Sequence, residues 1–143
     1  MKKYILVLFL LCGFYGFSQN VDLKKLPSAV NNRFSSLYPN VTDNEWGKVN
    51  LDNYETEFVY KEELYSVLFD TKGLVLETFQ QIKLTDLPAP VNEYITNNYA
   101  WKKILLASKV TDGRGKLTYR VTLGIDDIKL IFDYQGTFVR LSK

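Results

Sequence analysis

The stretch LPSAVNNRFSSLY at residues 26–38 returns as LPAPVNEYITNNY at residues 87–99, an offset of 61 positions. Farther along each copy, YSVLFDTKG at residues 65–73 returns as IKLIFDYQG at residues 128–136, an offset of 63 positions. Two blocks that recur in the same order are typical of a duplicated structural unit. The sequence therefore predicts a tandem repeat of a unit of roughly 60 residues.

The two copies span about residues 26–83 and 87–143, and the two extra residues of the second copy fall near residues 112–115. Each copy opens with an expected helix, over residues 27–38 and 88–99, because apolar side chains recur there at every third or fourth position. A proline near the start of each suits a first helical turn, where its missing N–H would have no partner.

After each helix the apolar period changes from 3.6 to 2, which predicts strands; Tyr54 and Thr56, for example, flank Glu55. An aspartate followed three positions later by a glycine, at residues 70–73 and 133–136, favours a type I hairpin turn. The expected fold is α+β, with one helix and about four antiparallel strands per copy. We expect one curved eight-stranded sheet, shared by both copies, with the two helices on one face.

Residues 1–18 have the pattern of a signal peptide, with two lysines, an apolar run over residues 4–12 and small residues before Gln19. We expect cleavage before Gln19, so that residues 19–143 form a single exported domain, periplasmic or secreted. The apolar run is too short for a membrane anchor. Lipoprotein processing at Cys12 is the other alternative, although a leucine precedes that cysteine where a small residue is required.

The charge of the chain argues against two classes of partner. The sequence has 18 lysines and arginines against 16 acids, and removal of the two lysines in the signal leaves 16 against 16. A neutral chain with scattered basic residues lacks the cationic patch that nucleic acids or anionic membranes require. We expect no nucleic-acid partner, no stable membrane insertion after cleavage, and a monomer.

The residue types exclude several chemistries. The chain has no histidine, and its one cysteine, Cys12, lies in the predicted signal. Triad-type serine hydrolases, cysteine enzymes and structural zinc sites require those residue types. No phosphate-binding glycine motif follows a predicted strand. We therefore expect no enzyme activity, no catalytic residues, no metal site and no cofactor.

Carboxylates and aromatic residues leave weaker alternatives open. Glu55 and Glu57 stand two apart on one strand, about 6.5 Å between α-carbons, but they project side by side rather than across a cleft as in a glycosidase. The aspartates of the predicted turns supply too few oxygen ligands for calcium. Trp46, Trp101 and the ten tyrosines would make a sugar or peptide platform if exposed, but their pattern assigns most of them to the core.

The repeated Leu-Pro-x-x-Val helices, the Tyr-x-x-x-Phe strand and the Phe-Asp-x-x-Gly hairpins resemble those of the PepSY-like, beta-lactamase-inhibitor-protein-like domains of secreted Bacteroidetes proteins. The resemblance covers residues 26–143. It implies a non-enzymatic extracytoplasmic module of a fold whose relatives bind or inhibit proteins through the sheet surface. It carries over no residue that would contact a beta-lactamase.

Alternation along the strands assigns a second set of side chains to the sheet face that the helices do not cover. On it we expect an apolar group with acids from one copy and bases from the other at its rim, the composition of a recognition surface. The candidate partner-binding residues are Glu55, Glu57, Val59, Leu64, Leu68, Arg120, Lys129 and Ile131. An extracytoplasmic protein is the expected partner. A small-molecule sensor or carrier, which would need a deep apolar cavity, and a carboxylate-based hydrolase remain as alternatives.

Overall fold

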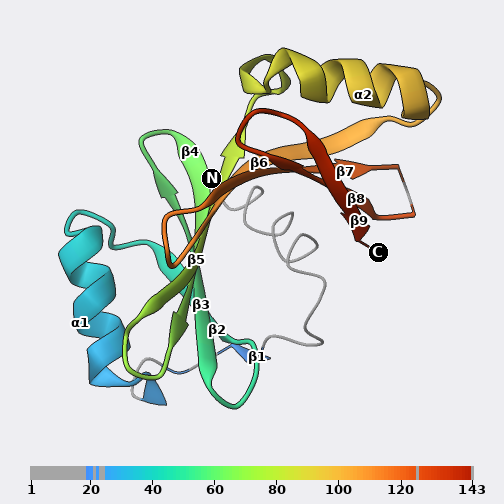
Figure 1. Cartoon of the computed structure of the whole chain (residues 1–143). Helices are drawn as coiled ribbons and strands as arrows, with labels where there is room; N and C mark the ends of the chain where they lie inside the picture. The colour runs from blue at the N-terminus through green and yellow to red at the C-terminus, as the bar shows by residue number, and fades with distance from the viewer. Residues whose placement is uncertain (1–18, 21, 23–24, 125, 143) are drawn as a thin grey trace. The chain divides into compact units, whose positions relative to one another are not determined.

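The computed structural model describes residues 19–20, 22, 25–124 and 126–142, so the predicted signal peptide and Cys12 lie outside the described residues. The chain divides into two compact units, of which the first ends at Thr78 and the second begins at Phe79. In its described residues, each unit contains one α-helix and a run of antiparallel strands (Figure 1).

Each helix starts directly after the repeated Leu-Pro pair, close to the predicted positions. Helix α1 spans Ser28–Leu37 and helix α2 spans Ala89–Tyr99. Prolines at the two N-caps accept the first-turn hydrogen bonds, from Val30 N–H at 3.0 Å and from Val91 N–H at 2.9 Å. The buried stripe of each helix is an aliphatic residue followed four positions later by a second apolar residue, as the periodicity predicts.

The described residues form nine strands; β1 to β4 pair antiparallel in the order of the chain, and so do β6 to β9. In the first part of the chain they are β1 (Gln19–Asn20), β2 (Asn44–Lys48), β3 (Asn53–Tyr60), β4 (Glu63–Asp70) and β5 (Val75–Ile82). The second part holds the short 3-10 helix η3 (Leu84–Asp86), β6 (Ile104–Asp112), β7 (Leu117–Leu123), β8 (Ile128–Asp133) and β9 (Phe138–Ser142). Two helices and the eight predicted antiparallel strands are thus confirmed. Whether both helices lie on one face of the sheet stays a prediction.

The first unit packs α1 on its strands through an aromatic core. Phe34 of α1 lies 5.4 Å from Trp46 and 5.1 Å from Phe58 between ring centroids, both in edge-to-face geometry. Phe69 of β4 is fully buried in the same cluster. The buried members of this core are Leu26, Val30, Phe34, Trp46, Tyr54, Phe58, Val67 and Phe69.

The second unit repeats this arrangement with mostly aliphatic side chains. Ala107 takes the position of Trp46, 61 residues earlier, and Ile95 takes that of Phe34. Tyr94 and Phe138 stack at 4.6 Å beside the smaller side chains. Phe132 and Ile95 lie in one cluster, as Phe69 and Phe34 do, so the predicted equivalence is confirmed. The buried members are Ile82, Leu87, Val91, Ile95, Ala107, Tyr119, Val121, Leu123, Leu130 and Phe132.

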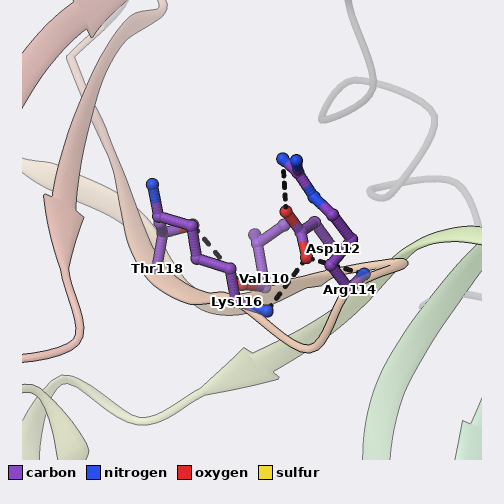
Figure 2. A network of polar contacts seen from close by, with 5 residues as sticks. All are labelled: Val110, Asp112, Arg114, Lys116 and Thr118. Atoms are coloured by element: carbon purple, nitrogen blue, oxygen red, sulfur yellow. Dashed lines mark hydrogen bonds and ion pairs between the residues drawn. The ribbon is translucent and has the colours of Figure 1, made fainter.

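The predicted Asp-x-x-Gly turns are present, and a third one joins β6 to β7. In each, the aspartate Oδ1 accepts two backbone N–H bonds, and the fourth residue donates its N–H to the aspartate carbonyl. Figure 2 shows the third turn, where the backbone N–H of Lys116, above all, holds the pKa of Asp112 below its usual value. The β6–β7 hairpin is four residues longer than the β2–β3 hairpin, and the β7–β8 hairpin is two residues shorter than the β3–β4 hairpin, so the second copy gains two residues in all.

The glycine that closes two of these turns touches its own helix. Gly73 has φ 81°, and a Cβ there would lie 2.5 Å from the carbonyl oxygen of Ala29 in α1. Gly136, with φ 87°, would place a Cβ 3.0 Å from Pro88. Both positions need glycine because of the positive φ and the close approach. The repeated glycine therefore docks the hairpin against the start of the helix.

Two features differ from the sequence-based expectation. Strand β1 pairs with β2 through two residues, Gln19 opposite Lys48 and Asn20 opposite Gly47, a length too short to produce an alternation. Trp101 is 78% exposed because it follows the end of α2 rather than lying on a strand. Among the described helices, none is long and apolar enough to cross a membrane.

Candidate functional site

The candidate face of the first unit is created by alternation along β3. Tyr54, Thr56 and Phe58 are buried, and the residues between them point to the opposite side of the sheet. Glu55 and Glu57 are partly exposed there, and Val59 is 56% exposed. The helix of the unit therefore covers only one of the two faces that β3 presents.

The antiparallel register of β3 and β4 brings the predicted residues of the first unit together. Glu55 stands opposite Leu68, Glu57 opposite Ser66, and Val59 opposite Leu64. Directly opposite side chains in such pairs have Cβ atoms about 4.5–5.5 Å apart. Leu64 and Leu68 are partly exposed. Five of the eight candidate residues thus lie on two neighbouring strands of one face.

Strand β2 adds an acid that the sequence analysis missed. Glu45 pairs directly with Glu57, and Gly47 pairs with Glu55. The sequence pattern that could have revealed Glu45 is the alternation around the buried Trp46, which assigns Glu45 to the other face of the sheet. We call the resulting surface the acidic sheet face. It consists of Glu45, Glu55, Glu57, Val59, Leu64 and Leu68.

Glu57 is the most perturbed group on the acidic sheet face. Burial, with the neighbouring Glu55 and then Glu45, raises the pKa of Glu57 to about 8. Its Oε2 atom is buried and has no hydrogen-bond partner among the described residues. In contrast, Oε1 of Glu55 accepts a hydrogen bond from the hydroxyl of Ser66. The raised pKa favours the protonated form of Glu57.

In the second unit, the structure contradicts two of the predicted exposed positions. Ile131 is only 7% exposed and Lys129 only 2% exposed. Ile131 lies between two arginines on neighbouring strands. Arg120 of β7 stands directly opposite it on one side, and Arg140 of β9 on the other. Long side chains on both sides remove the isoleucine from solvent. The predicted apolar group therefore does not extend to Ile131.

Lys129 is buried because the turn before β8 supplies its counter-ion. Asp127 adopts φ 51°, a conformation that aspartate tolerates better than most residues. Its Oδ2 lies 2.9 Å from Lys129 Nζ. Lys129 is consequently a buried ion-pair member rather than a rim charge.

Arg120 is the one predicted residue of the second unit that stays partly exposed. It stands opposite Ile131, and its backbone carbonyl accepts a hydrogen bond from Ser108 Oγ at 3.2 Å. That Arg120 contacts a partner stays a prediction.

The described residues show no group of three or more His, Cys, Asp or Glu side chains that could hold a metal ion. The two carboxylates of β3, Glu55 and Glu57, lie on the same face of one strand, as predicted. Glycosidase chemistry requires acids on opposite sides of a bound sugar. The arrangement on the acidic sheet face suits binding better than such catalysis.

Comparison with known proteins assigns the chain to a family. The sequence model of the family described as beta-lactamase-inhibitor-like, PepSY-like matches residues 17–77 and again residues 52–140. The two matches agree with the tandem repeat. A search of curated proteins finds no match.

Solved structures share the fold at low sequence identity. A DUF2874 family protein from Bacteroides ovatus is 21% identical, with a TM-score of 0.70 over 81% of this chain and 86% of that one. A BLIP-like protein from Bacteroides fragilis is 18% identical, with a TM-score of 0.67 over 89% and 88%. A Bacteroides eggerthii protein described as periplasmic is 16% identical, with a TM-score of 0.73 over 81% and 87%. The chain belongs to the beta-lactamase-inhibitor-like, PepSY-like family.

Proposed function

We propose that this chain is a non-enzymatic, extracytoplasmic module that binds a protein partner through the acidic sheet face. The observation that carries the proposal is the exposure of Val59 opposite the partly exposed Leu64, with the partly exposed Leu68 farther along the same face, which α1 does not cover. Apolar side chains with charged neighbours are the usual composition of a protein-recognition surface.

The charges on this face indicate the chemistry of the partner. Glu45 and Glu55 supply carboxylates, and none of the six residues of the acidic sheet face is a lysine or an arginine. A partner surface with aliphatic side chains and lysine or arginine would complement it. We therefore expect a basic and apolar patch on the partner rather than a nucleic acid or a small anionic ligand.

The extracytoplasmic location is part of the proposal. It is supported by the predicted signal peptide at residues 1–18 and by a solved structure of the same fold that is described as periplasmic. The absence of histidine, and of cysteine beyond Cys12, supports a function in binding rather than in catalysis.

Site-specific photo-cross-linking in the native host tests the proposal. A photo-reactive amino acid in place of Val59 is compared with the same amino acid in place of Leu37, an exposed residue of α1. We expect a discrete adduct with one other protein from position 59 and none from position 37. Equal adducts from both positions, or none from position 59, would contradict the proposal, as would an adduct with a second copy of this chain.

A further inference from the structure

The last strand of the sheet presents a second surface, independent of the acidic sheet face. Within the described part of the chain, β9 (Phe138–Ser142) pairs with β8 and is the final strand of the sheet order. An edge strand directs alternate backbone N–H and C=O groups outward, where an extended segment can pair with them. On β9, Val139 is 56% exposed and Leu141 is 41% exposed.

The register with β8 shows on which face of the sheet each side chain of β9 lies. Leu141 stands opposite the fully buried Leu130, so it lies at the rim of the core that α2 covers. Arg140 stands opposite Ile131 and therefore lies on the other face. The register shifts between Ile131 and Phe132, so Val139 is an extra residue in β9, and the regular part of the edge is residues 140–142. A strand added there would have Leu141 beside it on one face and Arg140 on the other.

Charge decides between two possible occupants of this edge. Arg140 is the middle residue of the five in β9, so antiparallel pairing of two copies in full register would place two arginines opposite each other. Like charges directly opposite in a sheet are destabilising. Arg140 is exposed, and no ion pair between described residues involves it. A carboxylate on the incoming strand would compensate it.

We propose that β9 accepts an extended segment of another protein, in which a glutamate or aspartate stands opposite Arg140 and apolar residues flank it. The segment adds a strand to the sheet through main-chain hydrogen bonds. The carboxylate and its apolar neighbours set the register and the specificity, because a shift by one residue would exchange the two faces.

Binding of fluorescently labelled peptides to a protein of residues 19–143, measured by fluorescence polarisation, tests this proposal. The probe is a nine-residue peptide with a central glutamate, a valine on each side and threonines elsewhere. One control peptide has lysine at the centre, and the other has N-methyl groups on alternate amides, which removes the strand-pairing donors. We expect the glutamate peptide to bind about fivefold to tenfold more tightly than the lysine peptide, and the N-methylated peptide not to bind.

A charge reversal, Arg140→Glu, makes the test independent of a folding defect, because it should invert the order of the glutamate and lysine peptides rather than abolish binding. A second variant, Leu141→Ser, should weaken both peptides. Equal binding of the two peptides to the native chain, or no binding of either, would overturn the proposal. A dimer of the native chain that Arg140→Glu abolishes would also overturn it, since a second copy would then occupy the edge.

Discussion

The substitution Glu57→Gln should make the stability of the protein less dependent on pH. In the folded chain, the pKa of Glu57 is raised from 4.5 to about 8, first by burial and then by Glu55 and Glu45. The unfolded chain ionises near the ordinary value. Between these two values the folded state holds a proton that the unfolded state has released. The free energy of unfolding therefore falls as pH rises from about 4.5 to about 8.

The size of this loss follows from the two pKa values. At about 1.36 kcal/mol per pH unit, the interval from 4.5 to about 8 sets an upper bound of about 5 kcal/mol. Glu57 is partly exposed, so solvent screening reduces the expected loss to about 1–3 kcal/mol. Glutamine has nearly the same shape and no charge. The variant should match the native chain near pH 4.5 and exceed its stability by that amount at pH 8.

The free energy of unfolding of the native chain and of the variant can be measured by urea unfolding followed by tryptophan fluorescence. Trp46 reports on unfolding because it is buried in the first unit and becomes exposed when the chain unfolds. The matched control is Glu93→Gln, at an exposed position of α2. The gain in the free energy of unfolding between pH 5 and pH 8 should be larger for Glu57→Gln than for this control. The reasoning is refuted if Glu57→Gln changes the free energy of unfolding equally at the two pH values, or lowers it at pH 8.

Three further predictions follow from the repeat, its turns and the predicted signal. Phe69→Ala and Phe132→Ala should each lower the free energy of unfolding by about 3–5 kcal/mol in chemical denaturation, because both rings are fully buried; a loss under about 1 kcal/mol in either would deny their equivalence. Gly73→Ala should cost about 2 kcal/mol more than Gly115→Ala, since both glycines have φ near 80° but only the first has a neighbour within 4 Å of the added Cβ; equal losses would remove the contact with α1 from the explanation. N-terminal sequencing of the protein from its host should begin at Gln19, and an intact Met1 would exclude the predicted cleavage.

Much of the fold was predictable because the same local sequence patterns occur in both copies of the repeat. The Leu-Pro helices, the change of apolar period and the Asp-x-x-Gly turns are local signals, and each depends on few residues. The pairing of Glu55, Glu57 and Val59 with β4 followed from the short connection at residues 61–62, which makes β3 and β4 neighbours.

The errors concern properties that depend on neighbours in space. Alternation placed Ile131 on the correct face, but its burial depends on the register with β9, which includes a bulge next to it. The burial of Lys129 depends on the backbone conformation of Asp127. Trp101 could have been recognised as exposed, because the repeat places Asn40 at the equivalent position.

The most direct measurement of the central claim is the dissociation constant of the protein cross-linked from position 59. Val59→Ser and Leu68→Ser alter the acidic sheet face, and Leu51→Ser alters an equally apolar, 84% exposed residue of the same unit outside it. If the acidic sheet face is the interface, the first two variants should bind about tenfold more weakly with unchanged thermal stability, and Leu51→Ser should bind like the native chain. Three equal dissociation constants would contradict the claim.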